Sequence, residues 1–134
     1  MVPPLVLIIE DNEANLMLER DLLELHGFRT VEARTAADGI ALAAERLPDV
    51  VLMDIHLGGA WDGVAALSRL RGDARTAGIP VLALTAYATD GDRERFQDAG
   101  FDGYLPRPID IKAFPATVRS FCRAAANEGR AKGA

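Results

Sequence analysis

The sequence predicts a doubly wound α/β domain in which five short parallel strands alternate with five helices. The first observation is a series of short apolar runs, at residues 5–9, 30–33, 50–53, 81–84 and 103–105. Runs of this length without polar alternation are typical of strands buried on both faces of a parallel sheet. The second observation is that a stretch of helical periodicity follows each run. Right-handed crossovers then place helices on both faces of the sheet, in three layers.

Apolar residues at helical spacing locate the five expected helices. Thr35 and Asp110 are the expected N-caps of the second and fifth helices, and Pro48 ends the second. The fourth helix, residues 90–99, is strongly charged, so we expect it to be the most exposed. The apolar positions, in chain order, are Leu18, Leu22 and Leu25; Ile40, Ala43, Ala44 and Leu47; Val64, Leu67 and Leu70; Phe96 and Ala99; and Ile111, Phe114, Val118 and Phe121.

Composition bounds the class of protein. The chain has 134 residues, 49% of them hydrophobic, with a net charge of −5, which is typical of one globular domain. We expect a domain over residues 1–125 and a flexible tail over 126–134. The acidic balance argues against direct binding to nucleic acid. Cys122 is the sole cysteine and the apolar run 5–9 is too short to span a membrane, so we expect a cytoplasmic protein.

Acidic residues follow two of the predicted strands. Glu10 and Asp11 come after the first strand, and Asp54 comes after the third. Ligands of doubly wound sheets bind beyond the carboxyl ends of the strands, where these three carboxylates would meet. Like charges brought together repel unless a cation neutralises them. A hard divalent cation with oxygen ligands, such as Mg²⁺, suits such a site.

The fourth and fifth strands place an anion-binding pair at the same edge. Thr85 follows the fourth strand, and Arg107 follows the fifth within "GYLPRPID". Pro106 and Pro108 flank Arg107, and two prolines so close make a stiff loop that holds this arginine in a defined place. A hydroxyl and a cation facing the acids suggest that a phosphoryl group on Asp54 occupies the site, since carboxylates are nucleophiles toward phosphoryl groups.

The segments "LIIEDN", "DVVLMDIHL", "VLALTAYA" and "AGFDGYLPRPI" stand in this order, each at a strand end. With these four segments in this order, the chain resembles the receiver domain of bacterial two-component response regulators, over about residues 5–123. The pattern is similar to stand-alone regulators of the cell-cycle and polarity type. The resemblance implies a flavodoxin-like (βα)5 fold with strand order 2-1-3-4-5. It also implies phosphoryl transfer from a sensor histidine kinase or a histidine phosphotransfer protein.

The resemblance assigns roles at the acidic edge. Asp54 would be the phosphoacceptor. Asp11 would bind Mg²⁺ or Mn²⁺ directly and Glu10 largely through water, with Asp54 and the backbone carbonyl of His56 as further ligands. His56 and Tyr87 fall where the family tunes dephosphorylation, and their size predicts a slow loss of the phosphoryl group.

The resemblance also assigns the switch. Thr85 and Ala86 would bind the phosphoryl oxygens, and Tyr104 falls on the family's switch aromatic. Arg107 stands where the family has a lysine before proline, at a peptide bond with Pro108 that is usually cis. An arginine there can bind phosphate with both arms of its fork. It can equally fail to reach in, or pair with a carboxylate in the resting state. The loop at residues 57–63 also departs from the family, by one extra residue and two adjacent glycines.

We expect a signalling switch, not an enzyme in its own right, that assists its own phosphorylation and dephosphorylation. Its output would be a partner protein bound by the fourth helix, the fifth strand and the fifth helix, and the resemblance allows a weak homodimer through the fourth helix. The alternative is a pseudo-receiver, an adaptor that is independent of phosphorylation. A haloacid-dehalogenase-type phosphohydrolase is disfavoured, because its Asp-x-Asp motif follows the first strand. A dinucleotide or flavin binder is disfavoured because no G-x-G-x-x-G follows that strand.

Overall fold

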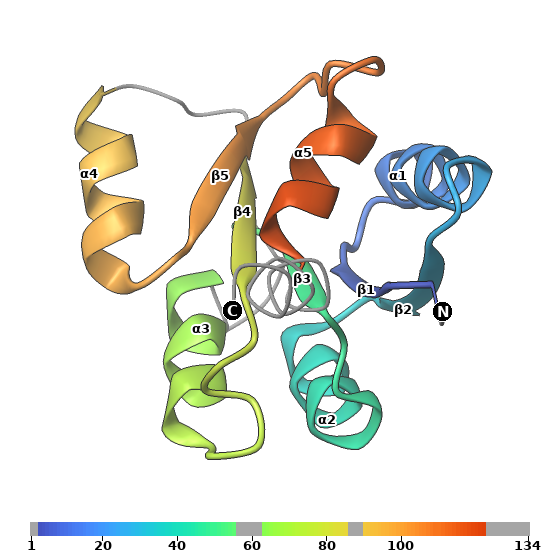
Figure 1. Ribbon diagram of the computed structural model, residues 1–134. Coiled ribbons are helices and arrows are strands. Elements are labelled where there is room, and N and C mark those ends of the chain that lie inside the picture. The colour runs from blue at the N-terminus through green and yellow to red at the C-terminus, as the bar shows by residue number, and fades with distance from the viewer. Residues whose placement is uncertain (1–2, 56–62, 86–89, 123–134) are drawn as a thin grey trace, which may run out of the picture.

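A five-stranded parallel sheet runs between two layers of helices (Figure 1). The computed structural model describes residues 3–55, 63–85 and 90–122. The strand order is β2-β1-β3-β4-β5, as predicted. The strands are β1 (Leu5–Ile9), β2 (Arg29–Ala33), β3 (Val50–Asp54), β4 (Val81–Thr85) and β5 (Gly103–Pro106). The helices are α1 (Glu13–Leu25), α2 (Ala36–Arg46), α3 (Gly63–Gly72), α4 (Asp90–Ala99) and α5 (Phe114–Phe121).

Side-chain alternation along the strands builds two cores. In β1, Leu7 and Ile9 belong to the core beneath α2, α3 and α4, whereas Val6 and Ile8 belong to the core beneath α1 and α5. Figure 1 shows the same division, with α1 and α5 on one side of the sheet and the other three helices on the opposite side. Burial on both faces explains why the strands read as continuous apolar runs. Within the described ranges, no helix combines the length and the apolar character needed to cross a bilayer.

The predicted strands are confirmed to within one residue at each end. Asp54 and Thr85 are the last residues of β3 and β4, and both are buried. In the register, Asp54 pairs with Leu84 and Thr85 pairs with Pro106. The parallel register therefore brings the ends of β3, β4 and β5 together at one edge of the sheet.

The second helix begins as predicted and ends slightly earlier than its apolar pattern suggested. The Thr35 hydroxyl oxygen accepts a hydrogen bond from the Asp38 backbone N–H at 3.1 Å, as an N-cap does. Leu47 was expected on the buried face, but it lies just beyond α2 with φ 49° and is 48% exposed. The chain leaves the helical path at Leu47 because Pro48 disfavours a helical conformation in the residue before it.

The predicted buried face of α1 was wrong at Leu18 and Leu25, whereas Leu22 is half-buried and packs against the core. Leu18 and Leu25 are 43% and 78% exposed, whereas Leu16, Glu19 and Leu23 are buried at positions i, i+3 and i+7. This row faces the sheet, and the leucine row that suggested the face flanks it. The sequence did not indicate this row, because the charged residue Glu19 stands between its two leucines.

The later helices match the prediction in part. In α3, Leu67 and Leu70 are buried, but Val64 is 43% exposed. In α4, Phe96 is buried and packs edge-on against Phe101, with ring centroids 6.1 Å apart. Ala99 is half-buried, so α4 has the two apolar anchors that its sequence offered.

The expected start of α5 was also wrong. Asp110 caps a turn that precedes the helix, since its Oδ1 accepts the N–H groups of Lys112 and Ala113 at 3.0 and 3.2 Å. The helix itself begins at Phe114, and Ile111 is 57% exposed. Pro115 explains the difference, because proline fits only the first turn of a helix.

Candidate functional site

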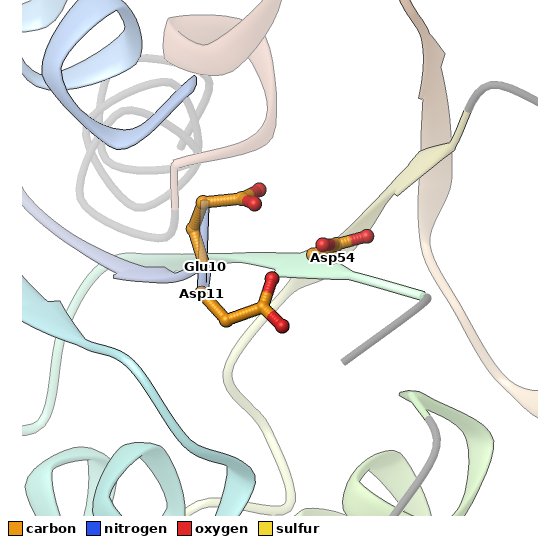
Figure 2. A group of neighbouring side chains, drawn as sticks. All are labelled: Glu10, Asp11 and Asp54. Atoms are coloured by element: carbon orange, nitrogen blue, oxygen red, sulfur yellow. The ribbon is translucent and has the colours of Figure 1, made fainter. Parts of the chain in front are cut away.

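Three carboxylates meet beyond the ends of β1 and β3. Oxygen atoms of Glu10, Asp11 and Asp54 all lie within 4.8 Å of one another. Figure 2 shows Glu10 and Asp11 leaving consecutive positions after β1 and Asp54 leaving β3, with their carboxylates around one space. Glu10 and Asp54 are buried and Asp11 is exposed. The sequence predicted this cluster from the positions of the three residues alone.

Glu10 is fixed from two directions. Its Oε1 accepts the backbone N–H of Asn12 at 3.1 Å, and its Oε2 pairs with Nη2 of Arg107. Asn12 in turn caps α1 by accepting the Asn15 N–H at 3.0 Å. Burial raises the pKa of the Glu10 carboxyl, and the contacts with Arg107 offset this only in part. The start of α1 therefore orients one carboxylate of the acidic cluster.

Arg107 reaches the cluster from the opposite side of the edge. Its backbone N–H donates to the carbonyl of Thr85 at 2.9 Å, and its peptide bond with Pro108 is cis. Its Nη1 lies 3.5 Å from Oδ1 of Asp54, while Nη2 pairs with Glu10. Burial opposes the charged form, but the hydrogen bond with Glu10 and the neighbouring acids raise the pKa of Arg107. Pairing with carboxylates was one of the arrangements expected for this arginine.

A fourth acid, which the sequence did not predict, lies beside the cluster and contacts Arg107. Glu19 of α1 is 1% exposed, and its Oε2 accepts a hydrogen bond from Arg107 Nη2 at 3.1 Å. Burial raises the pKa of Glu19 to about 7, against the opposing charge of Arg107. The available signal was the i, i+3, i+7 spacing of Leu16, Glu19 and Leu23, which places an acid on an apolar face. Arg107 thus pairs with three carboxylates, and one positive charge cannot neutralise them.

The remaining predicted residues divide into two groups. Thr85 is fully buried at the end of β4, and Tyr104 is half-buried in β5, where it pairs with Ala83 and packs against the core beneath α2, α3 and α4. His56, Ala86, Tyr87 and the loop at residues 57–62 lie outside the described residues. The structure therefore gathers Glu10, Asp11, Asp54, Thr85 and Arg107 at one edge of the sheet.

The parallel sheet makes this chain a doubly wound α/β domain. The acidic cluster places its candidate site beyond the carboxyl ends of the strands. The chain belongs to the response regulator receiver domain family, whose model matches residues 6–119. It is therefore a signal-transduction domain of the two-component class and not a member of a classical enzyme family.

Relatives and solved structures agree with this assignment. The chain is similar to the polar-differentiation response regulator DivK of Brucella anthropi, with 39% identity over 120 residues, 90% of this chain and 97% of that protein. DivK of Brucella ovis is 40% identical over 116 residues, 87% of this chain and 94% of that protein.

Chemotaxis response regulator CheY4 of Vibrio cholerae has the same fold, with a TM-score of 0.82 and 18% identity over 89% of this chain and 98% of that one. The receiver domain of sensor histidine kinase PA1611 from Pseudomonas aeruginosa has a TM-score of 0.80 and 28% identity, covering 89% and 97%. A magnesium ion is coordinated in the active site cleft of that receiver.

Proposed function

We propose that Asp54 accepts a phosphoryl group from a phosphohistidine of a sensor histidine kinase or phosphotransfer protein. The observation that carries this proposal is the position of the Asp54 carboxylate, beside Glu10 and Asp11 and 3.5 Å from Nη1 of Arg107. A carboxylate oxygen would bond to phosphorus as the bond from phosphorus to the donor nitrogen breaks. The nitrogen keeps that electron pair, and the product is an aspartyl phosphate.

The donor set fits a hard divalent cation, Mg²⁺ or Mn²⁺. Carboxylate oxygens of three residues within 4.8 Å of one another are oxygen donors close enough to hold one such ion between them. Glu10, Asp11 and Asp54 would hold it, with the carbonyl of His56, which lies outside the described residues. Such an ion, when bound, neutralises charge on the phosphoryl oxygens.

The chain's own residues would complete the phosphoryl site. Arg107 and Thr85, with Ala86 beyond β4, would bind the phosphoryl oxygens, so the receiver assists its own phosphorylation by positioning and charge. The Arg107 N–H to Thr85 carbonyl hydrogen bond, 2.9 Å long, joins the ends of β4 and β5, so a shift of one strand end moves the other.

Phosphorylation would then shift a two-state equilibrium that a partner protein reads. Tyr104 on β5 is the proposed switch aromatic, and α4, β5 and α5 are the proposed surface. Slow loss of the phosphoryl group is proposed from the size of His56 and Tyr87. The adaptor that ignores phosphorylation is not favoured, because a partner-binding scaffold has no need of three converging carboxylates.

The test is direct phosphorylation. The purified chain is mixed with Mg²⁺ and acetyl phosphate, and its intact mass is compared with that of Asp54→Asn treated in the same way. We expect one phosphate adduct on the wild type and none on the variant. A wild type that binds Mg²⁺ yet gains no adduct would overturn the proposal, and Arg107→Lys would show whether the arginine is the cause.

A further inference from the structure

Glu19 is a buried carboxylate that the proposed phosphotransfer site does not account for. It lies on α1, 1% exposed, in a row whose other members are Leu16 and Leu23. Its Oε2 accepts from Arg107 at 3.1 Å, and its Oε1 has no hydrogen-bond partner among the described residues. An apolar side chain would complete this row, so the presence of an acid requires a reason.

A stabilising role does not supply that reason. A carboxylate at this depth loses its hydration, and one hydrogen bond to a shared guanidinium returns little of it. The pKa of Glu19, raised to about 7, reflects this cost. Arg107 Nε is likewise buried without a partner in the described part of the chain. The Glu19–Arg107 pair therefore leaves one buried polar atom on each side without a hydrogen bond among the described residues. This is expected of a pair that orients the arginine and not of one that stabilises the fold.

We propose that Glu19 is the positioning residue that lets an arginine serve at this site, by holding Nη2 of Arg107 so that Nη1 faces the Asp54 carboxylate. A guanidinium is planar, so an acceptor that fixes one terminal nitrogen sets the direction of the other. Nη2 lies against Glu19 and Glu10, and Nη1 lies 3.5 Å from Asp54. This assignment rests on the proposed phosphorylation of Asp54.

The shared nitrogen gives Glu19 a specific task. Without Glu19, the remaining partner of Nη2 in these contacts is Glu10, and the guanidinium is drawn to that single acid at the metal-binding edge. With Glu19, Arg107 keeps one ion pair outside the acidic cluster and presents its second arm to Asp54. A lysine ammonium is a single point charge with no second arm to orient, so the proposal predicts that Glu19 matters only when residue 107 is arginine.

The experiment is a double-mutant cycle on the full chain. Phosphorylation by acetyl phosphate at saturating Mg²⁺ is followed by intact mass for wild type, Glu19→Leu, Arg107→Lys and the double variant. We expect Glu19→Leu to slow phosphorylation at least about tenfold in the arginine background, since misplacing a charge-stabilising group costs one to two orders of magnitude. In the Arg107→Lys background we expect less than about a twofold change.

Controls separate this proposal from a structural role. Glu24→Gln, on the exposed face of the same helix, should leave the rate unchanged, and urea unfolding should show Glu19→Leu folded and no less stable at pH 8. Nitrogen-15 NMR of the Arg107 guanidinium, assigned with Arg107→Lys, should show restricted rotation in the wild type and faster rotation in Glu19→Leu.

Equal slowing in both backgrounds, faster phosphorylation of Glu19→Leu, or unchanged guanidinium rotation would each overturn the positioning role. Absence of any adduct on the wild type is a different result. It would remove the proposed function itself, and with it the task assigned to Glu19, even if the NMR measurement showed the Glu19–Arg107 contact.

Discussion

Glu19 and Arg107 are 88 residues apart in the sequence, yet Oε2 of the acid lies 3.1 Å from Nη2 of the arginine. Their side chains are 2% and 16% exposed. The contact ties α1 to the segment that follows β5, and it is buried deeply enough for its charges to depend on each other. Two predictions about pH follow from this pair.

The first prediction concerns the charge of Glu19. Its pKa in the folded chain is raised from 4.5 to about 7, so the folded state holds the proton more tightly than the unfolded chain. The resulting stability is complete below pH 4.5 and is lost as pH rises through 7, a loss of about 3 kcal/mol. Glu19 faces Arg107, Glu10 and Asp54. Glu19→Gln cannot ionise at this position, so its free energy of unfolding should rise relative to that of the wild type between pH 5 and pH 8.

Urea unfolding in the presence of a chelator measures this difference. Glu24→Gln serves as the control, and its difference from the wild type should not vary over the same range. A Glu19→Gln difference that stays constant with pH, or that shrinks toward pH 8, would show that Glu19 carries no such shift.

The second prediction removes the cation. Arg107→Met leaves Glu10 and Glu19 buried beside a residue without charge, and removing one partner of a buried pair costs about 3–5 kcal/mol. The loss should be larger at pH 8 than at pH 5, because protonated acids need no cation. Arg75→Met, which breaks an exposed pair with Asp73, should change stability by no measurable amount. Equal losses at both pH values would argue that packing, not charge, explains the effect.

The third prediction uses the two glycines that bound α3. A Cβ at Gly63 would lie 2.9 Å from the backbone Cα of Ile55, whereas a Cβ at Gly72 would meet nothing within 4 Å. Backbone cannot yield as a side chain can, so Gly63→Ala should destabilise the chain by about 1–3 kcal/mol. Gly72→Ala should be neutral or stabilising by up to about 1 kcal/mol. Urea unfolding measures the stability of both variants. Similar changes in the free energy of unfolding would contradict the close approach at Gly63.

The fourth prediction concerns a second long-range contact, made by Arg71 of α3. Its guanidinium donates to the carbonyls of Ile79 and Gly100 at 2.7 and 3.1 Å and to Oδ2 of Asp102 at 2.7 Å. Arg71→Ala should cost about 1–3 kcal/mol, and Arg71→Lys should recover only part, because an ammonium cannot span these acceptors.

Hydrogen exchange locates the effect of Arg71. Val81 N–H donates to the Asp102 carboxylate at 2.8 Å, so its exchange should quicken in Arg71→Ala more than exchange within β1. Arg34→Ala, which removes an exposed pair with Glu13, is the matched control. Uniform quickening across the sheet would indicate global destabilisation in place of a local role.

The strands and the acidic cluster could be predicted because each depends on local sequence. A continuous apolar run marks a strand buried on both faces, and its last residue marks the edge where Glu10, Asp11 and Asp54 gather. A parallel sheet then brings the carboxyl ends of β1 and β3 to the same edge. No knowledge of a distant partner was needed to bring those three residues together.

Features that depend on distant partners were missed. The buried row of α1 contains Glu19, and nothing near Glu19 in the sequence indicates that Arg107 lies opposite.

The predicted start of α5 was wrong for a local reason. In the sequence, an aspartate that caps a turn cannot be told from one that caps a helix. Pro115 distinguishes the two, because proline fits only the first turn of a helix and so places the start of α5 close to residue 115.

A ribosome releases this chain with its acids first. Glu10, Asp11, Glu19 and Asp54 emerge well before Arg107, which follows the last strand of the sheet. Until β5 pairs with β4, the acids that follow β1 and end β3 must remain hydrated or protonated, because Arg107 is not yet in place to pair with them. The edge therefore closes only once β5 has been synthesised, and a chain truncated before β5 keeps acids that it cannot bury.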